Sequence, residues 1–325
     1  MRKYLIITIL SFIVIPTRSF AWGFWAHKKI NRQAVFILPP EMIDFYKEHI
    51  EYITEHAVDP DKRRYAIEGE APKHYIDLDH YCTYPCDSFP KEWDDALATY
   101  GDSTLQTYGT VPWTIEQKMY QLTMAFEELD FEKILKHSAD IGHYIGDSHV
   151  PLHTTENYNG QLTDQYGIHG FWESRLPELF NDDYDFFVGK AEYVRNPNEF
   201  IWENILLAHR ALDTVLLYEK ELDRQFPPDQ KYSYETRGET LVKTYSEAYS
   251  KVYHALLKGM VERQMRLSIK HVGDVWFTCW VNAGQPNLSL IKENEVEEIQ
   301  EEKLKENTVE SRPHAETGND IFEEE

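Results

Sequence analysis

The chain has 325 residues, and its 56 acidic against 33 basic residues give a formal net charge of −23. A surface this acidic disfavours unspecific binding to nucleic acid, because the phosphate backbone repels it. A chain of this length can bury a substantial hydrophobic core.

The first 21 residues have the pattern of a secretory signal peptide. Two basic residues precede an apolar run, 4–15, that is too short for a convincing membrane span. Residues 19–21 (Ser-Phe-Ala) offer the small residues that a signal peptidase reads. We expect cleavage after Ala21, which makes Trp22 the mature N-terminus, and export to the periplasm or out of the cell. An uncleaved anchor is the alternative.

Residues 22–290 have the pattern of one all-α, multi-helix domain. Apolar residues at helical spacing predict helices over 116–136, 198–218 and 234–270, and a helix rich in small residues over 138–148. Gly238 and Gly259 are expected to interrupt the long run 234–270. Alternating strands are scarce, and we find neither an internal repeat nor a Pro/Gly linker that would divide the domain.

The last segment, 291–325, is expected to be an acidic, disordered tail. It contains 13 acidic and 4 basic residues, a net charge of −9, and few large apolar ones. The three cysteines give a weaker signal. Cys82 and Cys86 lie close together in a loop that contains proline, and the sequence leaves open whether they form a disulfide.

Residues 143–173 hold five candidate metal ligands. His143 and Asp147 are four residues apart, and so are His169 and Glu173, with His153 between the two pairs. On a helix this spacing puts both members of a pair on one face, one turn apart. Imidazole nitrogen and carboxylate oxygen are ligands that zinc accepts. Two such pairs and a further histidine are therefore difficult to explain as an ordinary solvated surface.

Earlier segments hold further candidate ligands. A free α-amine at Trp22 could bind a metal ion once deprotonated, and His27 lies five residues further on. Asp59 and His74 are candidate ligands as well, and Asp61 competes with Asp59.

Taken together, this ordered set resembles the superfamily of zinc-dependent phospholipases C and single-strand-specific zinc nucleases. The resemblance spans residues 22–173 and implies an all-α domain that encloses a trinuclear zinc site, with about three zinc ions as cofactors. It prefers Asp59 to Asp61, because the distance from Asp59 to His74 fits the family better, and leaves open which carboxylate bridges two ions. The ligands it implies are Trp22, His27, Asp59, His74, His143, Asp147, His153, His169 and Glu173.

The resemblance implies a hydrolase that cleaves phosphodiester bonds. Asp59 is expected to hold zinc and to orient the attacking water, and Lys62 to contact a phosphate oxygen. Tyr75 and Asp77 are expected to contact the substrate, although Tyr75 could instead pack in the core. No Ser or Cys nucleophile is needed, and no protein partner is implied.

The substrate class is the open question. Glu173 and the 16-residue step from His153 to His169 are typical of the phospholipases, which would make contact with a membrane surface part of the function. The five-residue step from Trp22 to His27 and the spacing of Asp59 and Lys62 are typical of the nucleases. We expect phospholipase C-like hydrolysis of phospholipid headgroup esters. The alternatives are a single-strand nuclease or 3′-nucleotidase, and a non-enzymatic zinc-binding protein.

Overall fold

The computed structural model describes residues 23–237 and 240–291, and this part of the chain is mostly helical. The predicted signal peptide, Trp22 and the tail beyond Ile291 lie outside the described residues. The larger helices are α1 (Phe24–Val35), α2 (Pro40–Glu48), α3 (Ile50–Glu55), α5 (Trp93–Tyr100), α6 (Asp102–Tyr108), α7 (Val111–Glu128), α8 (Phe131–Ser148), α11 (Pro197–Gln225), α12 (Glu247–Leu256) and α13 (Met260–Asn282).

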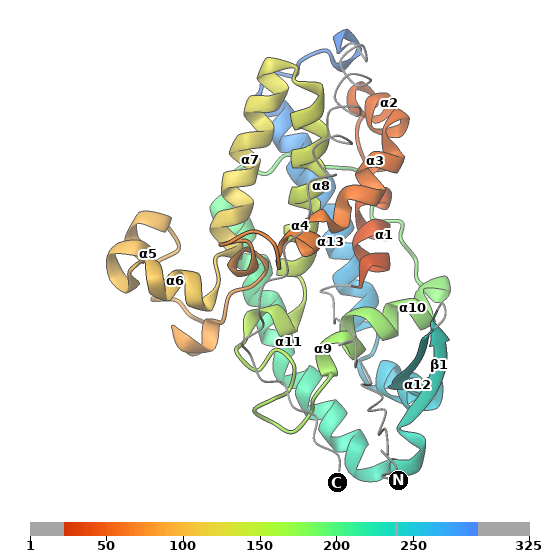
Figure 1. The fold of residues 1–325 in the computed structure, drawn as a ribbon. Coiled ribbons are helices and arrows are strands. Elements are labelled where there is room, and N and C mark those ends of the chain that lie inside the picture. The colour runs from red at the N-terminus through yellow and green to blue at the C-terminus, as the bar shows by residue number, and fades with distance from the viewer. Residues whose placement is uncertain (1–22, 238–239, 292–325) are drawn as a thin grey trace, which may run out of the picture.

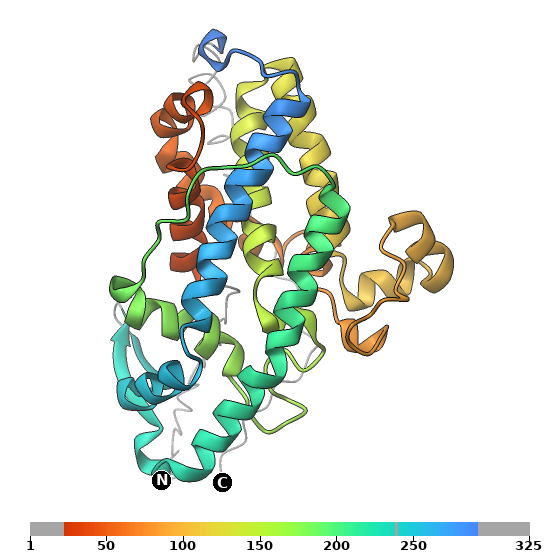
Figure 2. The ribbon, with the colours of Figure 1, turned by 180° about the vertical axis from the view of Figure 1, so that it is seen from behind.

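The long helices form an elongated bundle (Figure 1). Helix α8 packs against α1, α7 and α13, and α11 packs against α7. Helices α5 and α6 project from one side of the bundle. Seen from behind, α13 and α11 cover the back, and the segment that leads into α11 crosses α13 (Figure 2). That crossing is fixed by hydrogen bonds from the Glu192 amide to Asp274 and from the Val194 amide to Thr278. No helix among the described residues is long and apolar enough to span a membrane.

Helix starts follow local capping signals. The Asp130 side chain accepts a hydrogen bond from the Lys133 amide at 3.0 Å and caps α8. Asn196 caps α11 and Ser246 caps α12 in the same way. Such caps satisfy amide groups that have no partner inside the helix. The Asp130 cap also explains why the predicted helix over 116–136 is two helices: α7 ends at Glu128, and Leu129 turns the chain with a φ of 54°.

The prediction of a helix from residue 234 onward is wrong in its first part. Strands β1 (Tyr232–Arg237) and β2 (Thr240–Tyr245) form an antiparallel hairpin in which Tyr232 lies opposite Tyr245. The segment is rich in aromatic and β-branched residues, which favour strands. The interruption expected at Gly259 is confirmed, because this residue has a φ of 75° and separates α12 from α13.

Two glycines of α8 allow α1 to approach closely. A Cβ atom at Gly142 would lie 2.0 Å from Asn31 Oδ1, and one at Gly146 would lie 3.1 Å from His27 Nδ1. Because neither glycine has a side chain, His27 of α1 stacks on His143 of α8 with ring centroids 3.9 Å apart. The glycines therefore bring together two candidate ligands that are far apart in the sequence.

The short loop before α5 carries a disulfide. Cys82 and Cys86 are joined, with their Cα atoms 5.2 Å apart, and Cys279 is a buried free thiol. The disulfide answers the question that the sequence left open.

Candidate metal centre

Seven of the nine predicted ligands converge in the interior of the bundle, where Asp61 joins them. Four of the elements that carry them are labelled in Figure 1: α1, α4 (Asp59–Arg63), α8 and α9 (Ile168–Gly170). Helix α8 contacts both α1 and α4. The ligand atoms form three groups, and within each group they lie within 4.8 Å of one another. The groups are His27, Asp61 and His143; His74, His143 and Asp147; and His153, His169 and Glu173.

Asp147 connects these groups. Its Oδ2 atom lies 2.9 Å from His74 Nδ1 and 3.2 Å from His143 Nε2. Its Oδ1 atom lies 3.4 Å from His27 Nε2 and 3.7 Å from His153 Nδ1. The side chain is fully buried. One carboxylate thus faces histidines from all three groups, so that the groups form a single cluster.

Backbone carbonyls orient three of the histidines. The Nδ1 atom of His143 lies 2.8 Å from the Ala57 oxygen, that of His153 2.6 Å from the His74 oxygen, and that of His169 3.2 Å from the Tyr158 oxygen. Each carbonyl can only accept, so each Nδ1 donates its hydrogen to the carbonyl and each Nε2 is left to face the cluster. This is the arrangement by which proteins orient metal-binding histidines.

The group at His169 shows the consequence most clearly. The Nε2 atoms of His153 and His169 lie 3.2 Å apart, and Glu173 Oε2 lies 3.4 Å from the first and 3.0 Å from the second. Three acceptor atoms therefore point at one another, an arrangement that a shared cation stabilises. His169 and Glu173 also lie on one helical face, as their spacing predicts. The π-helical turn Phe171–Arg175 presents Glu173 to the cluster.

The cluster also contains buried polar atoms without a hydrogen-bond partner among the described residues. Such atoms are rare in folded proteins, because their desolvation is not compensated. They are His27 Nδ1 and Nε2, Asp61 Oδ2, His74 Nε2, Asp147 Oδ1 and both carboxylate oxygens of Glu173. Nitrogen and carboxylate oxygen are what a bound zinc ion requires. The residues therefore fit a metal ion, and these buried His, Asp and Glu groups could hold metal ions.

Burial and neighbouring charges set the protonation states of the cluster. Burial lowers the pKa of His27 to about 4 and of His74 to about 3, so both are neutral near pH 7. Burial also opposes the charged form of His143, but Asp147 and Asp61 outweigh it and raise the pKa of His143 to about 9. For Asp147, His143 and His153 outweigh burial and lower the pKa. Neutral imidazole and ionised carboxylate are the forms that bind metal, so a metal ion would have to displace a proton from His143.

The structure places Asp61, rather than the preferred Asp59, among the candidate ligands. Asp61 is buried, and its Oδ1 atom lies 3.8 Å from both His74 Nδ1 and His143 Nε2. Asp59 belongs to none of the three groups, because its side chain is partly exposed and pairs with His56 at 2.5 Å and with Lys62 at 2.8 Å. The two residues are two positions apart on one turn of helix, so they point in different directions.

Lys62, the expected phosphate contact, and Arg64 differ in their surroundings. Lys62 is 56% exposed and pairs with Asp59. Arg64 is half-buried and has no ion-pair partner among the described residues. Burial raises the pKa of Asp61 to about 7, and the nearby charges of His143 and Arg64 oppose that rise. The charge of Arg64 therefore acts on two residues of the cluster, Asp61 and His74. It stands three residues after Asp61, as Lys62 does after Asp59, and the sequence analysis did not single it out.

Tyr75 and Asp77, the predicted substrate contacts, belong to none of the three groups. The Tyr75 hydroxyl donates a hydrogen bond to the Thr107 carbonyl at 3.1 Å. Asp77 is buried, and burial, with Asp79 and Glu156, raises its pKa to about 7 even though His153 opposes the rise. Both residues follow His74 along the chain and lie near the cluster rather than within it.

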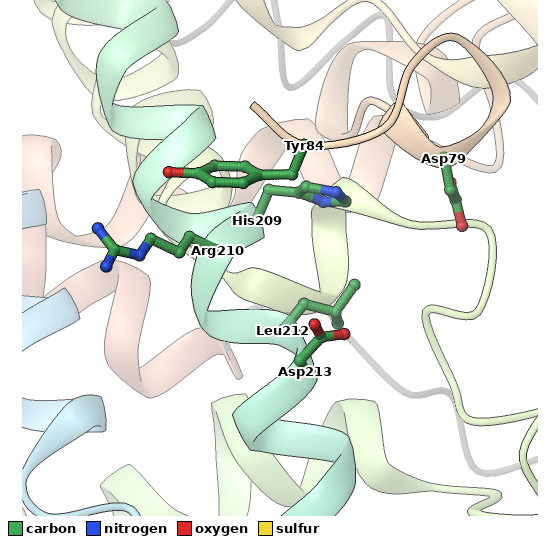
Figure 3. Close-up of a pocket in the computed structure, with 6 residues that line it drawn as sticks. All are labelled: Asp79, Tyr84, His209, Arg210, Leu212 and Asp213. Atoms are coloured by element: carbon green, nitrogen blue, oxygen red, sulfur yellow. The ribbon is translucent and has the colours of Figure 1, made fainter. Parts of the chain in front are cut away.

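A cavity of ≈ 320 Å³ lies beside the segment that carries His153. It is lined by Asp79, Tyr84, His209, Arg210, Leu212 and Asp213 (Figure 3). In Figure 3 the Tyr84 ring lies next to His209, and Arg210 points away from Asp79. The Nδ1 atom of His209 lies 2.9 Å from Thr154 Oγ1, and Asp79 accepts a hydrogen bond from Thr155 Oγ1 at 2.7 Å. None of the candidate ligands lines this cavity.

Comparisons with known proteins leave the resemblance untested. No protein-family model matches the sequence, and no curated protein matches it. The resemblance to the phospholipase and nuclease superfamily therefore stays a prediction.

Proposed function

We propose that this chain is an exported zinc-dependent phosphodiesterase, with phospholipase C-like hydrolysis of phospholipid headgroup esters as its reaction. The observation that carries the proposal is the connection of three buried ligand groups through Asp147. A cluster of adjacent divalent ions suits phosphodiester hydrolysis, in which negative charge accumulates on phosphate oxygens. Three groups of ligands correspond to about three zinc ions.

Some of these residues would bind the zinc ions, and others would act on the water and the phosphate. Zinc bound here would lower the pKa of a bound water and withdraw charge from phosphate oxygens. Asp147 and the histidines around it would hold the ions. Asp61 turns one oxygen toward His74 and His143 and leaves the other, Oδ2, without a hydrogen-bond partner. That free oxygen is suited to orient the attacking water and to accept its proton.

Arg64 is the proposed contact for a phosphate oxygen. Its guanidinium has no competing carboxylate among the described residues, and its charge acts on Asp61. A planar guanidinium can donate two parallel hydrogen bonds to a phosphate. Lys62 is already neutralised by Asp59 and is the weaker candidate.

A single-strand nuclease is the second candidate, because aromatic side chains border the cluster. Tyr158 is 51% exposed, and its ring stands edge-on to His169 at 5.7 Å. Exposed aromatic rings can stack on unpaired bases. The acidic chain and Glu173 favour the phospholipase reading.

The test is hydrolysis of phosphatidylcholine and of single-stranded DNA by the mature, zinc-loaded protein. We expect release of the phosphorylated headgroup, and loss of at least about 99% of that activity in Asp147→Ala. Lys270→Met is the control, because Lys270 of α13 pairs with Asp274 on the same helix and with Glu192 in the segment before α11, and with none of the candidate ligands. Cleavage of DNA alone would favour the nuclease. Bound zinc without turnover of either substrate would leave a non-enzymatic zinc-binding protein.

A further inference from the structure

Arg63 connects two buried carboxylates next to the metal centre. Its Nη1 and Nη2 atoms each lie 3.1 Å from Asp140 Oδ1, while Nε lies 3.3 Å and Nη2 3.2 Å from Glu70 Oε1. Both carboxylate side chains are only 3% exposed. We call Arg63, Glu70 and Asp140 the Arg63 bridge.

Each carboxylate of the bridge also has a lysine of its own. Lys73 lies 2.7 Å from Glu70 Oε2, and Lys118 lies 2.9 Å from Asp140 Oδ2. Among the described residues, Arg63 alone contacts both carboxylates. Loss of Arg63 would therefore leave each buried charge paired and remove only the link between them. The main effect of Arg63 is therefore to connect the segment of Glu70 to α8, because the lysines already neutralise the two carboxylates.

The bridge joins the segments that carry Asp61, His74 and His143. Arg63 follows Asp61 by two residues, and Glu70 precedes His74 by four. Asp140 lies on α8, three residues before His143. The hydroxyl of Tyr144 donates a hydrogen bond to Glu70 Oε1 at 2.5 Å, and its ring stands edge-on to His74 and His143, at 5.4 and 5.6 Å. Through Tyr144, the Arg63 bridge thus packs beside His74 and His143.

Asp61 and His74 need such support. They lie on α4 and on the short turn Ala71–His74, and residues 65–69 between these elements are exposed. Helix α8, to which the Arg63 bridge attaches this segment, is by contrast a long helix packed in the bundle. Ligand geometry is maintained only when the surrounding contacts fix it.

We infer that Arg63 is a positioning residue: it holds the Asp61–His74 segment in register with α8 and so sets metal affinity at this side of the cluster. The group of His153, His169 and Glu173 lies on other elements and should not depend on it. This inference rests on the proposed metal centre but not on the reaction proposed for it.

The experiment is a titration of the metal-free mature protein with Co²⁺, followed by its visible absorption bands, and with Zn²⁺ by calorimetry. We expect Arg63→Met to weaken binding on the Asp61 side about 10- to 100-fold, the range found when a supporting partner of a ligand is removed. Arg63→Lys should recover part of the affinity, because an ammonium group can reach one carboxylate but not both. His169→Ala identifies the ions held by the other group, and these should bind Arg63→Met normally.

Lys270→Met is the control, since Lys270 likewise pairs with two carboxylates, the buried Asp274 and the exposed Glu192. Wild-type affinity at every site of Arg63→Met would overturn the inference, and so would an equal loss in Lys270→Met. If Arg63→Met does not fold, an Arg63→Lys protein with unchanged affinities would overturn it instead. A wild-type protein that binds no metal contradicts both this inference and the proposed function. Selective loss of affinity in a protein that hydrolyses neither substrate supports the inference and contradicts only the function.

Discussion

Asp147 Oδ2 lies 2.9 Å from His74 Nδ1, although 73 residues separate the two in the sequence. The contact joins helix α8 to the turn that ends at His74. It brings the pair of His143 and Asp147, which can be recognised in the sequence, together with His74, which has no candidate ligand close to it in the sequence. The cluster therefore depends on tertiary packing as much as on the spacing within 143–173.

Asp61→Asn should reduce hydrolysis by at least about 100-fold, whereas Asp59→Asn should change it less than about threefold. Asp61 is buried and faces His74 and His143, while Asp59 forms partly exposed pairs with His56 and Lys62. The two substitutions are chemically identical and lie two residues apart, so each controls for the other. The measurement is the hydrolysis rate at saturating zinc. A larger loss in Asp59→Asn would restore the original preference from the sequence.

Arg64→Gln should lower kcat/KM by about 10- to 1000-fold without changing zinc content, because a donor to the phosphate is lost while the ligands stay. Lys62→Gln should have little effect, since Lys62 is exposed and already paired with Asp59. The measurements are kcat/KM from steady-state kinetics and the zinc content of both variants. Equal rates in Arg64→Gln and the wild type would remove Arg64 from the substrate site.

The stability of the metal-free protein should fall as the pH falls from about 6.5 to about 4. Buried histidines whose pKa is lowered stay neutral in the folded state, while the unfolded chain takes up protons near its ordinary pKa of 6.5, so acid favours unfolding. Burial lowers the pKa to about 4 for His27, His137 and His149, to about 3 for His74 and to about 2 for His271.

Groups whose pKa is raised act in the opposite direction. Against the effect of burial, Asp147 and Asp61 raise the pKa of His143 to about 9, so this group favours folding as the pH falls from about 9 to about 6.5 and changes little below that range. Burial raises the pKa of Asp61 and of Asp77 to about 7, so both bind a proton more readily in the folded state and favour folding over the same pH range. The histidines outnumber them. Thermal unfolding of chelator-treated protein at pH 7, 6 and 5 should show a decreasing Tm. A constant or rising Tm would mean that these histidines are not held neutral.

Removal of the signal peptide should be required for full zinc loading. Neither ring nitrogen of His27 has a hydrogen-bond partner among the described residues, and the Trp22 amine is its expected co-ligand. A chain that begins with Met-Ala21 should fold, bind about one zinc ion fewer and hydrolyse substrate slowly. The comparison is with protein trimmed to Trp22, verified by mass spectrometry of the intact chain. Equal zinc content in the two forms would show that the amine is not a ligand.

The sequence predicts the helical pairs of the cluster because their geometry is local. His143 with Asp147, and His169 with Glu173, need only the helical repeat to face the same side. The choice between Asp59 and Asp61 depends instead on how one short turn, α4, packs against α8. Spacing to His74 cannot determine that orientation. The position of Arg64 beside Asp61 depends on the same packing.

The fold shows the same division between local and tertiary information. The capping signals that begin α8 and α11 can be read in the sequence at Asp130 and Asn196. The hairpin was missed because a short amphipathic segment before a long helix resembles that helix in its apolar spacing. Its strands are stabilised by their pairing and by contacts such as the stacking of Tyr245 on Phe171, with ring centroids 3.8 Å apart.

The most direct test of the metal centre is the zinc content of the mature protein. It is measured by inductively coupled plasma mass spectrometry after dialysis against metal-free buffer. We predict about three zinc ions per chain, and about two or fewer in Asp147→Ala, because this carboxylate faces histidines of all three groups. Lys270→Met should retain the wild-type content. A wild-type protein that holds one zinc ion or none, even after incubation with excess zinc, would contradict the trinuclear centre on which the proposed function depends.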